Sequence, residues 1–205
     1  MKINNNQKGF TLVELLAVIV ILAVLALVAM PNVTKLMDSS RKNAFITEAE
    51  NFANYAKQSY TQSQITGLTD TNSTTDESII RGVTLNSKVY DYYCITYAQM
   101  VKAGLIEKSN GETYGGVYEI FMPTDGGVST TVVYMKNGNY FINGLSLDVL
   151  AKGEKAYTTE TGSNEFKFNN SSASSLSRTQ CYLKKDATSA LATHVSNLNK
   201  AGQFN

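Results

Sequence analysis

The feature that most constrains this chain is an apolar run near its N-terminus. Residues 10–30 read FTLVELLAVIVILAVLALVAM, which is 21 residues with a single charge, Glu14, and no glycine or proline. A helix of this length spans roughly 31 Å, close to the ~30 Å hydrocarbon core of a bilayer. Because every face of that helix is apolar, the run predicts a membrane helix or a helix surrounded by other helices.

The remaining residues must be polar, because the whole chain averages to an ordinary composition. Of 205 residues, 43% are hydrophobic and only 17% are charged, and 18 basic residues balance 17 acidic ones to a net charge of +1. This balance argues against nucleic-acid binding through bulk positive charge. The length fits one domain or two small ones.

The polar leader before the apolar run does not read as an ordinary secretory signal. Such a signal ends in a small-residue cleavage site beyond its apolar segment. Here Lys2 and Lys8 lie in the leader and the small residue Gly9 precedes the apolar run. A cut after Gly9 would leave the hydrophobic helix on the mature chain. Basic residues lie on both sides of the run, so charge alone does not fix its orientation.

Glu14 is the unusual residue inside the apolar run. A carboxylate near the middle of a bilayer costs about 2.5 to 3.5 kcal/mol, so it must reach the interface or find a partner. One interpretation is a tolerated charge near the membrane surface. The other is a partner created by cleavage after Gly9, which would leave a positively charged amine on Phe10 of a neighbouring subunit.

These residues together carry a family resemblance. The segment Lys8-Gly9-Phe10-Thr11-Leu12-Val13-Glu14-Leu15-Leu16, followed by an apolar helix and Pro31, resembles the class III signal of type IV pilins and pseudopilins. The resemblance covers roughly residues 1–60. It implies that a membrane prepilin peptidase cuts between Gly9 and Phe10 and methylates the new amine of Phe10. It also implies that Glu14 pairs with a Phe10 amine during filament assembly.

The resemblance also implies partners and a location. The partners would be other copies of the chain and related pilins, the prepilin peptidase and the pilus assembly machinery. The chain would first be a single-pass protein of the inner or cytoplasmic membrane with its head outside, and then part of a cell-surface filament. We expect a structural subunit of a type IV pilus that serves adhesion, motility or surface colonisation, with the adhesion target unidentified.

Two other function classes remain open at this point. The alternative within the family is a pseudopilin of a DNA-uptake machine or of a type II secretion machine. A weaker alternative is a membrane-anchored binding or enzymatic domain that never polymerises. The head is rich in Ser, Thr, Asn and Gly, which favours a displayed pilin surface.

Beyond Met30 the helical pattern continues with apolar residues on one face. It predicts one helix from about Phe10 to Ser63, with Pro31 kinking or locally melting it, or simply marking the membrane exit. About 54 residues make a rod of roughly 80 Å, so its outer half must pack against a head. The expected organisation is a leader at 1–9, a long helix at 10–64 whose residues 10–30 cross the membrane, and a globular head at 65–205.

The fold class expected for the head is α+β, with the long helix packed against an antiparallel β-sheet. Residues 61–78 read as an exposed connection, and the capping-box spacing of Thr96 and Gln99 predicts a short helix that stops at Gly104. We expect strands at 117–122, 130–135 and 140–142, with a type I′ turn at Asn137-Gly138. The later segments expected are a helical turn at 146–151, weaker strands at 166–168 and 179–183, and a weak helix or loose tail at 186–205.

The two cysteines, Cys94 and Cys181, both fall in the head. Outside the membrane a disulfide is plausible, whereas in a reducing compartment both would be buried apolar residues. Closing a loop of about 88 residues would stabilise the fold by roughly 4 to 5 kcal/mol in the chain-entropy model. Both interpretations remain open from the sequence.

No catalytic or metal-binding pattern is recognisable in the head. His194, the only histidine, lies in a polar stretch and is expected to be solvated. Asp70, Asp76 and Glu77 lack the ligand spacing and central glycine of a calcium loop. The paired glycines read as turns rather than as nucleotide-binding loops. We therefore predict a chain that is not an enzyme and binds neither a metal nor a cofactor.

Overall fold

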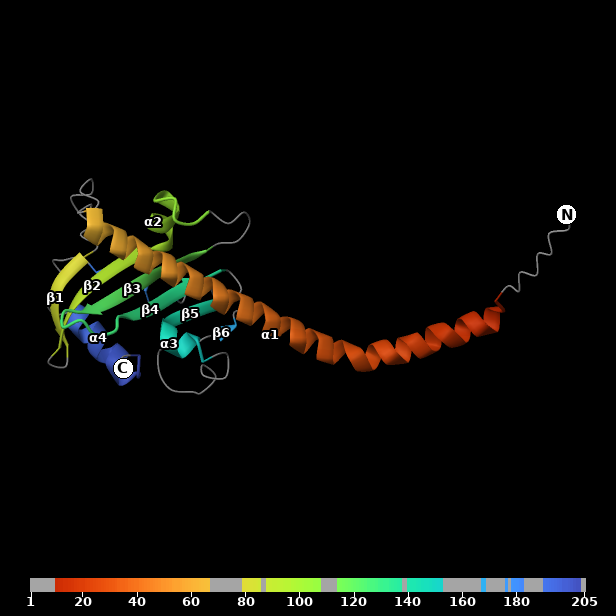
Figure 1. Ribbon diagram of the computed structural model, residues 1–205. Coiled ribbons are helices and arrows are strands. Elements are labelled where there is room, and N and C mark those ends of the chain that lie inside the picture. The colour runs from red at the N-terminus through yellow and green to blue at the C-terminus, as the bar shows by residue number, and fades with distance from the viewer. Residues whose placement is uncertain are drawn as a thin grey trace, which may run out of the picture. The chain divides into compact units, whose positions relative to one another are not determined.

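The computed structural model describes residues 10–66, 79–85, 88–107, 114–137, 140–152, 167–168, 176, 178–182 and 190–203. The chain divides into two units, Met1–Lys42 and Asn43–Asn205, and helix α1 (Leu12–Thr66) contributes to both. Figure 1 shows α1 as one continuous helix. The elements thus combine a long N-terminal helix with an antiparallel sheet, which confirms the α+β layout expected from the sequence.

The first unit is the apolar part of α1. All residues from Phe10 to Asp38 are exposed, including the leucines, valines and isoleucines of the apolar run. Among the described residues, α1 is one helix that is long and apolar enough to cross a membrane. Its apolar side chains therefore find nothing to pack against within the described part of this unit.

Helical backbone continues through Pro31, so this residue neither ends nor melts the helix. Proline lacks an N–H and so leaves the carbonyl of Leu27 without its usual helical donor. One turn later, the hydroxyl of Thr34 donates to the carbonyl oxygens of Met30 and Pro31, at 3.1 and 3.2 Å. The local melting predicted at Pro31 is therefore wrong, and a kink there stays a prediction.

The second unit is built on a sheet that runs in chain order. Among the described residues, six strands pair as β1-β2-β3-β4-β5-β6, and every neighbouring pair is antiparallel. The strands are β1 (Ile79–Leu85), β2 (Lys88–Thr96), β3 (Gly115–Pro123), β4 (Thr130–Lys136), β5 (Tyr140–Ser146) and β6 (Lys167–Phe168). The meander predicted for β3, β4 and β5 is confirmed, whereas β1 and β2 were not predicted.

Three short helices complete the second unit. Helix α2 (Tyr97–Lys102) begins with the predicted capping box, because Thr96 and Gln99 bond each other's backbone, and it stops at Gly104. Helix α3 (Leu147–Leu150) is the predicted helical turn, and α4 (Ala190–Lys200) resolves the C-terminal alternatives in favour of a helix. The strand predicted at 179–183 is wrong for residues 179–182, which are irregular.

Some predicted features differ or fall outside the described residues. Helix α1 continues to Thr66, so the first six residues of the expected connection at 61–78 are helical. The rest of that connection is not described. Gly138 lies outside the described residues, so the turn type there stays a prediction. Asp70, Asp76 and Glu77 lie outside them as well.

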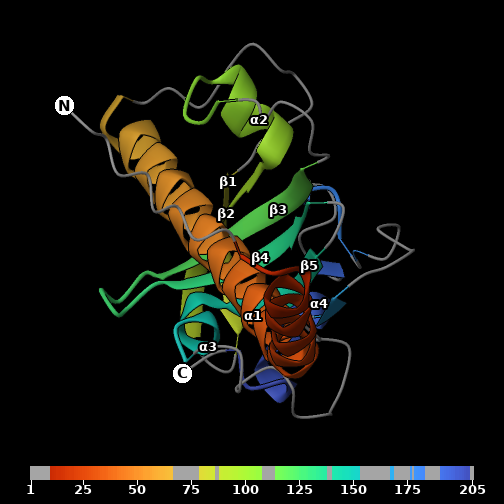
Figure 2. The same ribbon diagram turned by 90° about the vertical axis from the view of Figure 1, so that its right-hand side faces the viewer.

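Side chains alternate between the two faces of the sheet, as the twofold repeat of a strand requires. Tyr93, Ile95, Tyr118, Ile120 and Val133 share a core with the second half of α1. Their neighbours along the same strands face the other way and share a core with α4. Figure 2 shows the two helices on opposite sides of the strands. Because both faces are covered, β3 and β4 read as nearly continuous apolar runs.

A stripe of alanines brings α1 close to the sheet. Ala49, Ala53 and Ala56 are completely buried, and aromatic rings flank them. At one end Phe45 stacks on Tyr140 with ring centroids 5.6 Å apart, and at the other Tyr60 meets Tyr93 at 5.4 Å. Small residues at the centre and rings at the ends let a straight helix fit a twisted sheet.

Backbone geometry requires glycine at two positions in strands β1 and β3. Gly116 has φ +152°, and a Cβ there would collide with the carbonyl oxygen of Tyr134 on β4. Gly82 has φ +73° and lies where the pairing of β1 with β2 shifts its register. That irregularity, beside the exposed Arg81, interrupts the edge strand, which discourages pairing with another sheet.

The alanine stripe generates a stability prediction. Replacing Ala53 with leucine should reduce the free energy of unfolding by about 1 to 3 kcal/mol, because the added atoms have no space between α1 and the sheet. The matched control is Asn54→Leu on the exposed face of the same turn. We expect this variant to change the free energy of unfolding by less than about 0.5 kcal/mol. Urea unfolding of the full chain in detergent micelles measures both. Equal effects of the two variants would contradict close packing at Ala53.

Candidate functional site

The described part of the N-terminal segment begins with an exposed residue and a capping box. Phe10 is 88% exposed and Thr11 precedes the first turn of α1. The backbone N–H and the hydroxyl of Thr11 donate to Oε2 of Glu14, at 2.8 and 2.9 Å, and the N–H of Glu14 donates to Oγ1 of Thr11 at 3.3 Å. This reciprocal arrangement is a capping box, which fixes where the helix starts.

The capping box gives Glu14 a local partner within its own chain. Its carboxylate lies at the N-terminal end of the helix, where the helix dipole favours negative charge. Among the described residues, its hydrogen bonds go to Thr11 and not to a basic side chain. The predicted contact with a Phe10 amine belongs between subunits and stays a prediction, as does cleavage after Gly9, which lies outside the described residues.

A second polar site lies inside the head and was not predicted. Glu119, on β3, is 0% exposed, and five polar or charged side chains surround it. They come from four places in the fold: Tyr92 on β2, Tyr134 on β4, Arg178 and Tyr182 on the irregular segment 178–182, and His194 on α4. We call Glu119 and these five residues the Glu119 cluster.

Both carboxylate oxygens of Glu119 have partners. Oε1 accepts the hydroxyl of Tyr92 at 2.9 Å and lies 2.8 Å from Nε of Arg178. Oε2 lies 2.8 Å from Nε2 of His194. An ionised carboxylate only accepts hydrogen bonds, so a bond between these two groups needs the hydrogen on Nε2 of His194. A buried carboxylate is costly unless it is paired and hydrogen-bonded in this way.

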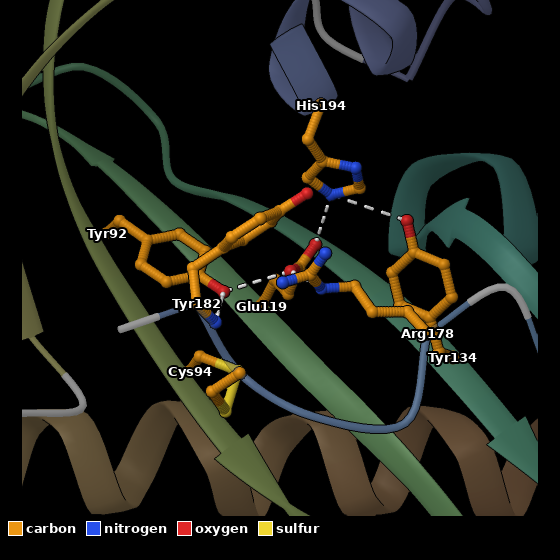
Figure 3. Close-up of polar contacts among 8 residues, drawn as sticks. Tyr92, Cys94, Glu119, Tyr134, Arg178, Tyr182 and His194 are labelled. Carbon is orange, nitrogen blue, oxygen red and sulfur yellow. Dashed lines mark hydrogen bonds and ion pairs between the residues drawn. A yellow bond between two sulfur atoms is a disulfide. The ribbon is translucent and has the colours of Figure 1, made fainter. Parts of the chain in front are cut away.

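Arg178 and His194 are themselves held in place by aromatic rings. The guanidinium carbon of Arg178 lies 3.2 Å from the ring centroid of Tyr182, and the Arg178 side chain is only 14% exposed. Its Nε makes an ion pair with Glu119 without an aligned hydrogen bond. The His194 ring lies 5.3 Å from that of Tyr182, and its Nε2 is 3.4 Å from the Tyr134 hydroxyl (Figure 3).

The prediction that His194 is solvated is therefore wrong. Its side chain is 14% exposed and contacts a carboxylate that is distant in sequence but adjacent in the fold. The histidine lies on the inner side of α4 beside the buried Leu191, Val195 and Leu198. The sequence did contain one signal for this site. Glu119 lies on the same face of β3 as the apolar residues Val117 and Phe121, which are both buried. A carboxylate at such a position is expected to be buried and to need a partner.

The disulfide lies beside this cluster. Cys94 on β2 and Cys181 in the segment 178–182 are bonded, with their Cα atoms 5.6 Å apart. Of the two interpretations left open by the sequence, the structure has the disulfide. Cys94 is completely buried. The residue after Cys181 is Tyr182, and the guanidinium of Arg178 lies over its ring.

The described residues contain no group of three or more His, Cys, Asp or Glu side chains placed to hold a metal ion. The Glu119 cluster holds one carboxylate and one imidazole among cationic and phenolic groups, and these groups bond one another. What the arrangement can do chemically is hold chain segments together. Two of its three tyrosines, Tyr92 and Tyr134, are buried, and Tyr182 is partly buried.

The comparisons with known proteins identify the N-terminal segment. Residues 4–30 match the family model described as the prokaryotic N-terminal methylation motif, the prepilin-type signature of type IV pilins and pseudopilins. No curated protein and no solved structure matches the chain. The motif implies processing by prepilin peptidase and assembly into pilus-like filaments in general. Together with the apolar helix, this motif fits a membrane-anchored, pilin-like protein.

The buried tyrosines of the head generate a pH prediction. Burial raises the pKa of Tyr92, Tyr118 and Tyr134 above the ordinary value of 10.0, and Glu119 raises it further for Tyr92 and Tyr134. The unfolded chain therefore loses these protons first, as the pH passes 10. Their contribution to folding is fully present below pH 10 and is lost as the pH rises toward the folded-state pKa values.

A spectrophotometric titration of phenolate absorbance measures this effect. In the folded chain some tyrosines should remain protonated well above pH 10 and ionise only when the head unfolds. The control is the same chain in concentrated guanidinium, where all tyrosines should ionise near pH 10. Complete ionisation near pH 10 with the fold intact would contradict the burial described for these rings.

Proposed function

We propose that this chain is a structural subunit of a type IV pilus. In this proposal prepilin peptidase cuts between Gly9 and Phe10 and methylates the Phe10 amine, and the subunits polymerise through the apolar half of α1. The observation that carries the proposal is the methylation motif at 4–30, which includes the apolar first part of α1, where every residue from Leu12 to Met30 is exposed.

The exposed helix supports polymerisation as well as membrane anchoring. Large apolar side chains cover α1 on all faces from Leu12 to Met30. In a bilayer, lipid covers them. In a filament outside the membrane, identical helices must cover them instead, because water would not. The same surface can serve both states, since a helix that is apolar all round suits either environment.

Glu14 is the residue that distinguishes the two states in this proposal. In the single chain its carboxylate bonds Thr11. In the filament it pairs with the Phe10 amine of a neighbouring subunit, which neutralises two charges in an apolar bundle. Head display outside the cell, and roles in adhesion, motility or surface colonisation, are parts of the same proposal. The alternative is a pseudopilin of a DNA-uptake machine or a type II secretion machine, which shares the processing steps and differs in the length of the filament.

The first test of the proposal is the state of the N-terminus and of the assembled material. Filaments are sheared from the producing cells, imaged by electron microscopy with antibody to the head, and analysed by mass spectrometry. We expect long labelled filaments whose subunits begin at methylated Phe10. Short or absent surface filaments with the same methylated N-terminus would favour the pseudopilin alternative. An uncleaved chain would exclude both.

The second test is replacement of Glu14 by valine. Because the amine of Phe10 would lose its partner, we expect filament yield to fall by at least about tenfold, while membrane insertion persists because the helix becomes more apolar. The matched control is Glu50→Gln, which removes a carboxylate from α1 outside the apolar run and should leave filament yield unchanged. Quantitative immunoblots of the sheared and membrane fractions measure both. An unchanged filament yield in the Glu14 variant would contradict the assembly role.

A further inference from the structure

The C-terminal part of the head covers one face of the sheet. Residues 178–182 and 190–203, which we call the C-terminal strap, lie on the face opposite α1 (Figure 2). Leu191, Val195 and Leu198 of α4 are at most 3% exposed and share a core with β-strand residues that include Tyr92 and Phe121. If the strap left the sheet, this apolar face would meet water.

A covalent lock holds the start of the strap. The disulfide joins Cys181 to Cys94, which lies two residues before the C-terminal end of β2. It fixes the segment 178–182 beside the sheet, 13 residues before His194 in the chain. With this anchor closed, α4 can only re-dock close to where it left, because a short tether gives it a high effective concentration at the sheet.

An ionic lock holds the same strap at two points. Glu119 on β3 contacts Arg178 at the start of the strap and His194 within α4, both at 2.8 Å. One buried carboxylate therefore joins two parts of the strap to one strand. At the far end, Oε1 of Gln203 accepts the backbone N–H of Ser146 at 2.7 Å, a bond that does not involve either lock.

The two locks are neighbours in the sheet. Cys94 and Glu119 are directly paired residues of the antiparallel strands β2 and β3, so their side chains stand side by side on one face. Figure 3 shows the disulfide and the Glu119 contacts at this position. Because they anchor the same segment at adjacent points, loss of one leaves the strap close enough for the other to hold it.

We propose that the C-terminal strap is held by a double lock, in which either the Cys94–Cys181 disulfide or the contacts of Glu119 with Arg178 and His194 alone keep it docked. Release then requires that both locks open. Opening the disulfide takes two electrons and two protons, supplied in the test by dithiothreitol, and yields two thiols. In the test, the ionic lock is opened by replacing Glu119 with glutamine, which removes the negative charge.

Hydrogen exchange of the full chain in detergent micelles tests the double lock. Exchange rates of the α4 amides are compared in four states: wild type and Glu119→Gln, each with the disulfide closed or reduced, with intact mass confirming the two hydrogens gained on reduction. We expect each single change to raise the rates less than about tenfold. Together they should raise them at least about tenfold more than the product of the two single effects.

The control removes a different carboxylate from the neighbouring strand. Asp91→Asn on β2 loses the exposed ion pair with Arg81, at 3.6 Å, and keeps an oxygen for the N–H of Gly82. In the reduced chain, Asp91→Asn should leave the α4 exchange rates at the values that reduction alone produces. The proposal would be overturned if Glu119→Gln and reduction together raised the α4 exchange rates by no more than the product of their single effects. This holds whichever lock contributes more.

A second variant covers the case in which Glu119→Gln disturbs the sheet itself. Protection of the β3 and β4 amides reports this directly. Glu119→Gln/Arg178→Met removes both charges and so leaves no buried guanidinium without a carboxylate. The same comparison is then made with this double variant. Loss of β3 and β4 protection in both variants with the disulfide closed would overturn the proposal, because Glu119 would then hold the sheet rather than the strap.

Discussion

The structure depends on how the apolar surface of the first half of α1 is covered. Its side chains are exposed from Leu12 to Met30, and the described residues of that unit offer nothing to cover them. Burial of apolar surface is the main favourable term in folding and association, so such a helix has to be completed by lipid or by other chains. Thr11 and Glu14 place one capped, charged end on this otherwise uniform surface.

The head differs in this respect, because both faces of its sheet are covered by segments of its own chain. One face receives the second half of α1 and the other receives α4 and the segment before it. The first cover is purely apolar at its centre. The second includes a buried carboxylate, two basic side chains and a disulfide, so it is specified by polar contacts as well as by shape.

The sequence predicted the elements whose signals are local. The long helix followed from its apolar periodicity, α2 from its capping box, and β3 to β5 from apolar runs bounded by turn residues. Strand β2 was missed because the charged Asp91 interrupts its run of strand-forming residues, and β1 is interrupted by the irregularity at Gly82. The Glu119 cluster was missed for a different reason. His194 and Glu119 are 75 residues apart, and only the folded sheet with α4 across it brings them together.

The completely buried alanines of α1 have a consequence for how the chain can be divided. Ala49, Ala53 and Ala56 belong to the core of the head, although by sequence they lie in the same helix as the exposed apolar run. A fragment that starts after Thr66 would lack one entire layer of its own core. A water-soluble version of the head must therefore keep the helix from about Asn43 onward, where the second unit begins.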